Sequence, residues 1–171
     1  AEVPVGSYAT YVPELDSIAY GKPVTFRPFI NAYQYMKYDA EKNEYSNRSI
    51  IFKSWKDEAI DAKGGVRCGK IPAKEIANLS EEERAKQKSI KCYRLIYGLV
   101  SFEGVLPGGA DAHVSNLPVL WKVTGSNFKP VGEAIESLRR RGKVMFNHTL
   151  TLKTKKKKAG SNVFYVSDIT V

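Results

Sequence analysis

The sequence predicts a mainly-β fold in which three strands, one helix and two further strands follow one another. Apolar residues alternate with other residues in segments near residues 23–38, 48–55 and 91–104. Residues 126–142 have the apolar spacing of a helix, and residues 143–171 alternate again. This is the order of a five-stranded OB-fold barrel (β-β-β-α-β-β), although an α+β sandwich would have the same order of strands and helices.

The chain of 171 residues has the length of one domain that carries an insertion. Residues 1–22 contain two prolines and two glycines, which predicts an N-terminal arm or an edge segment. Residues 23–171 then form the OB-fold domain. We expect its insertion, with a helix, at about residues 56–90, between the second and third strands.

Turn signals delimit the first strands. The stretch DAEKNEYSN (39–47) has the composition of a turn, so residues 48–55 are expected to return as the second strand of a hairpin. In the insertion, Ser80 followed by Glu83 forms a capping-box pattern, which predicts an exposed helix within residues 72–90. Residues 91–104 form the clearest third strand.

The second half of the chain predicts a Gly/Pro-rich loop (105–116), a short apolar strand (117–125) and a helix (126–142). One face of that helix carries Phe128, Val131, Ile135 and Leu138, and Gly142 follows its basic last turn. Residues 143–171 are expected to form a hairpin with KKKKAGSN as its turn.

The net charge of +9 is concentrated in one segment. Residues 126–160 hold ten Lys or Arg and only two Glu, whereas the preceding 125 residues contribute a net charge of only +2. Such a patch attracts a polyanion, which is either a nucleic acid or an anionic membrane. Without an apolar run long enough for a membrane span, a signal peptide or a cysteine framework, we expect a cytoplasmic protein that does not bind membranes.

The motifs of enzymes are incomplete in this chain. Gly64, Gly69 and Lys70 match a phosphate-binding loop, but Ile71 stands where Ser or Thr is needed. The two cysteines and two histidines lack the spacing of a zinc site. We therefore expect no enzyme, no cofactor and no bound metal. A metal-dependent nuclease that uses the acids at positions 57, 58 and 61 remains the alternative.

The stretch TFRPFINAYQYMKYD (25–39) combines rings and cations. Because successive side chains of a strand point to opposite faces, one face would carry Arg27, Phe29, Tyr33, Tyr35 and Lys37. Rings stack on the bases of a single strand, and cations bind its phosphates. The same chemistry recurs on the next two strands and in the last hairpin, at Lys53, Trp55, Tyr93, Arg94, Tyr97, Lys153, Lys155, Lys156, Lys157 and Lys158.

A resemblance adds to this interpretation. The stretches LPVLWKVTGSNFKP and LRRRGKVMFNHTLTLKTKKKKAGSNVFYV, together with FRPFINAYQYMKYD, resemble the single-stranded DNA-binding proteins of tailed bacteriophages, an OB-fold group. The resemblance implies coating of transient single strands during DNA replication, recombination and repair, without catalysis. It implies base stacking by Phe29, Tyr33, Tyr35 and Trp55, and phosphate contacts from Arg27, Lys53 and Lys155 to Lys158.

The expected partner is therefore single-stranded DNA, in the host cytoplasm if the protein is phage-encoded. Members of this group often recruit replication or recombination proteins through an acidic C-terminal tail, whereas this sequence ends at SDITV with one acid. A homo-oligomer is compatible with the sequence. An RNA-binding OB module remains a further alternative, because stacking and phosphate contacts do not distinguish the two sugars.

Overall fold

The computed structural model describes residues 3–54, 59–60, 67–68 and 73–171. Its strands are β1 (Tyr8–Val12), β2 (Ser17–Gly21), β3 (Val24–Asp39), β4 (Glu44–Ser46), β5 (Ala59–Ile60), β6 (Arg67–Cys68), β7 (Lys91–Val105), β8 (Asp111–Val123), β9 (Leu150–Ala159) and β10 (Asn162–Thr170). Its α-helices are α1 (Ala73–Ile76), α2 (Glu81–Ser89) and α3 (Phe128–Arg140), and short 3₁₀ turns occupy Pro13–Leu15, Gly125–Asn127 and Met145–Asn147.

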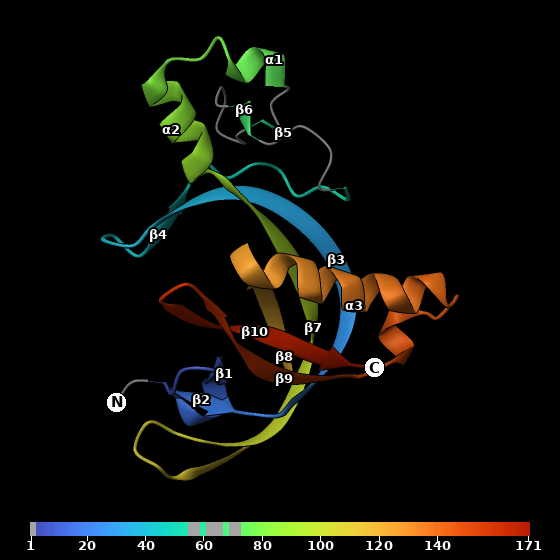
Figure 1. The fold of residues 1–171 in the computed structure, drawn as a ribbon. Coiled ribbons are helices and arrows are strands. Elements are labelled where there is room, and N and C mark those ends of the chain that lie inside the picture. Colours follow the sequence, from blue (N-terminus) through green and yellow to red (C-terminus); the bar gives the residue numbers. More distant parts are fainter. Residues whose placement is uncertain (1–2, 55–58, 61–66, 69–72) are drawn as a thin grey trace. The chain divides into compact units, whose positions relative to one another are not determined.

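The mainly-β fold is confirmed (Figure 1). Eight strands form one open antiparallel sheet in the order β1-β2-β7-β3-β9-β10, with β4 beside β3 and β8 beside β7. The strands β5 and β6 pair with each other separately. The chain divides into two compact units: residues 1–30 with 96–171 form the first unit, and residues 31–95 form the second.

The N-terminal residues are part of the sheet. β1 and β2 form a hairpin, and β2 continues the sheet by pairing Tyr20 with Val105 of β7. The alternating burial of these strands places Ala19 in the core of the first unit. The segment expected as an arm or an edge therefore supplies a two-stranded edge of the sheet.

The prediction that residues 48–55 form the second strand of a hairpin is wrong. Of residues 40–54, only those of β4, inside the predicted turn, pair with β3 as a strand, with Tyr45 opposite Tyr38. Residues 48–54 instead run beside β3 with isolated contacts, among them the paired backbone hydrogen bonds of Tyr33 and Phe52. Asn43 and Asn47 adopt positive φ, so the backbone turns sharply on both sides of β4.

The third predicted strand and both predicted helices are confirmed. β7 matches the expected range, and α2 begins with the expected capping box between Ser80 and Glu83. α3 ends at Arg140, and Gly142 just beyond it has a φ of 64°. There the backbone N–H groups of Gly142 and Lys143 donate to the carbonyl oxygens of Arg139 and Leu138, which is a Schellman motif. β8 begins earlier than expected, at Asp111, which shortens the predicted loop.

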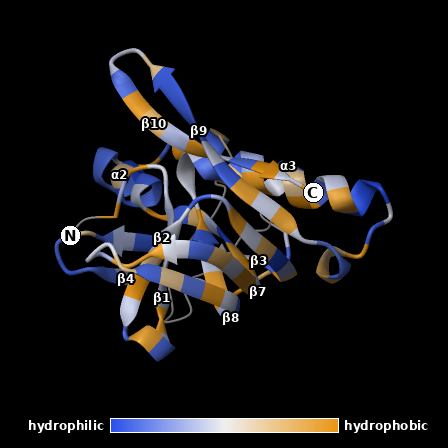
Figure 2. Ribbon diagram, turned by 90° about the horizontal axis from the view of Figure 1, so that it is seen from below, coloured by the Kyte–Doolittle hydropathy of each residue, from blue (hydrophilic) through white to orange (hydrophobic). Residues whose placement is uncertain are grey.

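The final hairpin starts later than residue 143, where it was predicted to start, and its turn is shorter than the predicted KKKKAGSN. Residues 145–147 form a 3₁₀ turn, and β9 starts only at Leu150. The four consecutive lysines belong to β9, and the loop consists of residues 160–161 alone, because Ala159 pairs with Asn162. Gly160 has a φ of 61°, which such a two-residue loop requires. Figure 2 shows the far part of this hairpin extending beyond the other strands of the first unit.

The main core lies in the first unit and joins the sheet to α3. Val131, Ile135 and Leu138 of the predicted helix face are buried there. They belong to the same cluster as Phe26 of β3 and Leu150 of β9. This packing fixes the strands that carry the exposed residues described below.

Candidate nucleic-acid interface

Two exposed rings lie together on the surface of the first unit. Phe29 of β3 and Tyr97 of β7 are each 37% exposed. They line a groove of about 320 Å³, the ring groove, whose lining is Phe29, Tyr97, Gly98, Leu99, Pro118, Val119 and Leu120. A flat apolar groove with exposed rings is a surface on which nucleobases can stack.

A guanidinium group stands beside the ring groove. The Cζ atom of Arg27 lies 5.5 Å from the centroid of the Phe29 ring, within the range of a cation–π contact. The Arg27 Nε donates a hydrogen bond of 2.6 Å to the carbonyl oxygen of Phe146, which orients the side chain. The remaining guanidinium donors can therefore meet a phosphate next to a stacked base.

Gly98 determines how closely β7 approaches β3 at this groove. A Cβ atom at Gly98 would lie 2.4 Å from the carbonyl oxygen of Arg27 and 2.7 Å from the Phe26 ring. Neither the backbone nor the buried ring can move far, so only glycine fits. This close approach places the preceding residue, Tyr97, beside the strand that carries Phe29.

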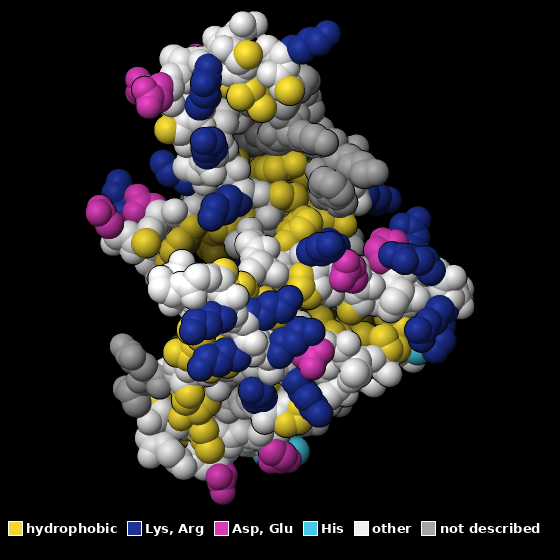
Figure 3. All heavy atoms as spheres, viewed as in Figure 1, with side chains coloured by type: hydrophobic (Ala, Val, Ile, Leu, Met, Phe, Trp, Pro, Cys, Tyr) yellow, Lys and Arg dark blue, Asp and Glu magenta, His cyan; other side chains and the backbone are white. Residues whose placement is uncertain are grey.

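A row of lysines follows the last hairpin of the first unit. Lys153 and Lys155 to Lys158 are all exposed, and the surface view shows basic side chains gathered over the β9–β10 hairpin (Figure 3). The Lys155 Nζ lies 3.9 Å from Asp168 Oδ1, with both side chains half exposed. No other ion pair of these lysines with a described residue is present. We call residues 155–163, which are exposed throughout, the lysine ribbon.

Part of the lysine row shares a face with the ring groove. Thr25 of β3 pairs with Thr151 of β9, and paired residues of antiparallel strands point to the same side. Alternation then puts Arg27 and Phe29 on the same face as Lys153, Lys155 and Lys157. From Phe29 to Lys157 the path along the two strands is ten residues, or about 33 Å.

The predicted open face does not continue into the second unit. Tyr33, Tyr35, Tyr93 and Arg94 are buried, with 5–7% of each residue exposed. The Tyr35 ring stacks on Phe52 at 5.3 Å, and the Arg94 Nη1 donates to the Tyr33 hydroxyl at 2.9 Å. The expectation that these four side chains are open to a ligand is wrong, because other side chains already occupy their faces.

The cause is that β3 is covered on both sides beyond residue 31. On one side Tyr35 packs with Phe52, Ile90 and Cys92, and on the other Met36 packs with Leu95 and Tyr93. The Ser49 Oγ accepts a hydrogen bond of 3.0 Å from the Tyr35 backbone N–H, which holds the covering segment in place. Because β3 is covered on both faces here, its even-numbered and its odd-numbered residues are both buried.

The other predicted residues of the second unit are dispersed. Lys37 is half-buried opposite Ser46, and Lys53 is exposed in the covering segment. Trp55, Asp57, Glu58 and Asp61 lie outside the described residues.

Sequence reasoning missed a basic aromatic cluster in the second unit. Arg48 lies 5.5 Å from the centroid of the Tyr45 ring, and Tyr38 packs beside Tyr45 at 5.1 Å. The signal was the tyrosine within the predicted turn, which is unusual in a solvated loop. Asp39, Glu41 and Glu44 surround this cluster in the sequence, so its local charge is balanced.

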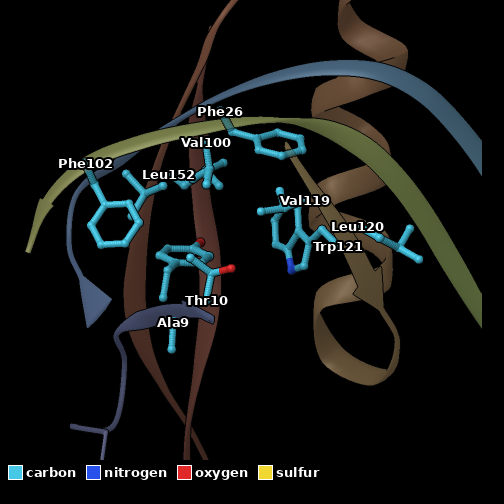
Figure 4. A pocket seen from close by; sticks show the side chains of 11 residues that line it. Ala9, Thr10, Phe26, Val100, Phe102, Val119, Leu120, Trp121 and Leu152 are labelled. Carbon is cyan, nitrogen blue, oxygen red and sulfur yellow. The ribbon is translucent and has the colours of Figure 1, made fainter. Parts of the chain in front are cut away.

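The first unit also contains an apolar cavity of about 100 Å³ (Figure 4). The Trp121 ring forms one wall and makes edge-to-face contacts with Tyr8 at 5.9 Å and Phe26 at 5.7 Å. No acid, histidine, lysine or arginine is among the lining residues. Tyr8 and Thr10 carry the hydroxyl groups of this lining, and the Tyr8 hydroxyl already bonds to the Lys153 carbonyl oxygen and to Ser167 Oγ.

In the described parts of the chain, the side chains that could bind a metal ion are dispersed. No three His, Cys, Asp or Glu side chains come together there as possible metal ligands. Burial raises the pKa of the Cys92 thiol to about 11, so this half-buried side chain stays protonated at neutral pH and is a poor nucleophile. Among the described helices, none is long and apolar enough to cross a membrane.

We expect Tyr33→Phe to destabilise the protein by about 1.5–3 kcal/mol, since it removes the acceptor of a buried charged hydrogen bond. Urea denaturation would measure this loss. Tyr38→Phe is the matched control, because the Tyr38 hydroxyl donates its hydrogen bond to Asn43 Oδ1 at an exposed site. An equal effect of the two substitutions would contradict the structural role assigned to Tyr33.

No family model, curated protein or solved structure matches this chain. The candidate interface therefore depends on its own geometry, which is the ring groove with Arg27 and the lysines on the same face of the first unit.

Proposed function

We propose that this protein binds single-stranded DNA with little sequence preference and acts in DNA replication, recombination and repair. The observation that carries the proposal is the ring groove beside Arg27, with further cations on the same face of the sheet. Stacking requires bases whose faces are free, which a single strand offers and a closed duplex does not. Aromatic stacking tolerates every base, so the surface favours no sequence.

We further propose that the first unit is a barrel of the OB type. The pairing order β8-β7-β3-β9-β10, with α3 between β8 and β9, supports this proposal. In this arrangement β3 is the first barrel strand and β7 the second. The inserted segment then lies between the first and second strands, not between the second and third as the sequence suggested.

The barrel interpretation agrees with the position of the candidate interface. OB folds bind oligonucleotides on the face of their second and third strands and with the loops after strands one and four. The ring groove is lined by residues of β7 and β8 besides Phe29, and the lysine ribbon ends in the loop between β9 and β10. In such a barrel, both features would lie where an OB fold binds its ligand.

We expect Phe29→Ala and Tyr97→Ala each to weaken binding to a 16-nucleotide dT oligomer by about 5- to 150-fold. This range corresponds to about 1–3 kcal/mol for each lost stacking contact. Fluorescence anisotropy with a labelled oligomer at one fixed salt concentration measures the effect. Because both rings are partly exposed, the melting temperature should change little.

Tyr11→Ala is the matched control, since Tyr11 is an exposed ring of the first unit that lies outside the groove. If Tyr11→Ala weakened binding as much as the two groove variants do, the groove would not be the binding surface. Equal affinity for an RNA oligomer would instead favour the RNA-binding alternative. Shortened oligomers after incubation with Mg²⁺ would favour the nuclease.

A further inference from the structure

The lysine ribbon presents cations on two opposite faces. Its four consecutive lysines lie in a regular strand, each opposite one residue of β10: Lys155 opposite Val166, Lys156 opposite Tyr165, Lys157 opposite Phe164 and Lys158 opposite Val163. Successive side chains of a strand point to opposite sides. Lys155 and Lys157 therefore point to the side of the ring groove, and Lys156 and Lys158 point to the other.

Beyond Leu152, β10 alone among the described strands pairs with β9. The pairing of β3 with β9 ends where Val24 meets Leu152. Thr154 and Lys153 are still held by the N-terminal segment, through hydrogen bonds to the Gly6 carbonyl and from the Tyr8 hydroxyl. Residues 155–163 are exposed, whereas their β10 neighbours Phe164 and Tyr165 are half-buried and Val166 is buried. The lysine strand and the tip of the hairpin are therefore open to solvent and extend beyond the other strands of the first unit (Figure 2).

The ribbon offers charge without exposed rings. Phe164 and Tyr165 on β10 are only partly exposed, and the Tyr165 ring lies against Gly6, within 3 Å of where a Cβ would stand. Such a surface binds the phosphate backbone and has no stacking platform for unpaired bases. The ring groove, about 33 Å away along the strands, has the opposite character.

A single strand has one row of phosphates and can meet only one face of the ribbon. A duplex has two rows, and its major groove, about 12 Å wide, admits a two-stranded β-ribbon. Lysines on both faces match the phosphate rows that flank such a groove. We propose that the lysine ribbon binds duplex DNA next to the single strand in the ring groove, so that the preferred ligand is a junction of single-stranded and duplex DNA.

This inference rests on the proposed function for its single-stranded part. Lys156 and Lys158 are the residues that distinguish binding of the duplex from binding of the single strand. They point away from the ring groove and are not required for a single strand on the groove side. They complete the contact when a duplex is present.

The experiment compares three labelled DNAs at one salt concentration: a 16-nucleotide dT oligomer, a 16-base-pair duplex, and a junction of that duplex with a dT tail of 16 nucleotides. We expect the wild-type protein to bind the junction at least about tenfold more tightly than the oligomer. Lys156→Gln/Lys158→Gln should abolish this preference while leaving the affinity for the oligomer unchanged. Lys155→Gln/Lys157→Gln should weaken binding to both.

A variant with equal loss of charge provides the control. Arg140→Gln/Arg141→Gln removes two exposed cations at the end of α3 in the same unit, and it should keep the junction preference. Equal wild-type affinity for junction and oligomer would overturn the inference, and so would an unchanged preference in Lys156→Gln/Lys158→Gln. Failure of the wild-type protein to bind the oligomer would instead overturn the proposed function.

Discussion

Raising the salt concentration from 50 to 200 mM should weaken binding of the 16-nucleotide dT oligomer by about 50-fold. Four cations lie on the face of the ring groove, namely Arg27, Lys153, Lys155 and Lys157. Each phosphate contact to a single strand contributes about −0.7 to the slope of log K against log salt, which gives a slope of about −2.8. A titration at four or five salt concentrations measures it.

The paired lysine variants test which cations produce this slope. Lys155→Gln/Lys157→Gln should halve it to about −1.4, because two phosphate contacts are lost. Lys156→Gln/Lys158→Gln removes the same charge from the opposite face and should leave the slope for the oligomer unchanged. If both variants changed the slope equally, net charge and not position on the ribbon would govern binding. If the affinity of the wild-type protein for the oligomer did not change with salt concentration, the proposed phosphate contacts would be excluded.

The substitution Phe26→Ala should reduce the free energy of unfolding by about 3–5 kcal/mol. Phe26 is 2% exposed, packs edge-to-face on Trp121 and already borders the apolar cavity of the first unit. Removing the ring would enlarge that cavity, since strands held by hydrogen bonds cannot collapse into it. For a chain of this length the expected fall in melting temperature is about 6–20 °C.

Phe146→Ala is the control for this prediction, because that ring is 48% exposed and its backbone carbonyl still accepts the Arg27 hydrogen bond. It should change the melting temperature by no more than a few degrees. A similar loss in both variants would mean that the interior around Phe26 is not the main core. The Phe26 variant should also lose affinity for DNA, since Phe26 lies on the strand that carries Arg27 and Phe29.

The sequence predicted the burial pattern correctly for elements that face the core with one side only. The alternation from Val24 to Phe29 and the helical spacing of Val131, Ile135 and Leu138 both match the burial in the structure. Local signals also placed the capping box of α2 correctly. In each case the pattern that determines the structure lies within a few consecutive residues.

The sequence did not predict burial or strand pairing where these depend on segments that are distant in the sequence. Tyr33 and Tyr35 continue the alternation of β3, but residues 48–54 cover their side of the strand, and no local pattern reveals that cover. The lysines of β9 have low strand propensity and suggested a turn. Their pairing with the apolar and aromatic residues of β10 holds them in the sheet instead.

The position of β10 at the end of the strand order has a consequence for the free protein. Where the pairing of the described strands leaves an outer strand open, a second molecule can pair with that strand edge to edge, which is the first step of aggregation. The four lysines on the adjoining strand place like charges at that point and repel an approaching copy. We therefore expect the cations that we assign to DNA also to oppose edge-to-edge self-association of the DNA-free protein.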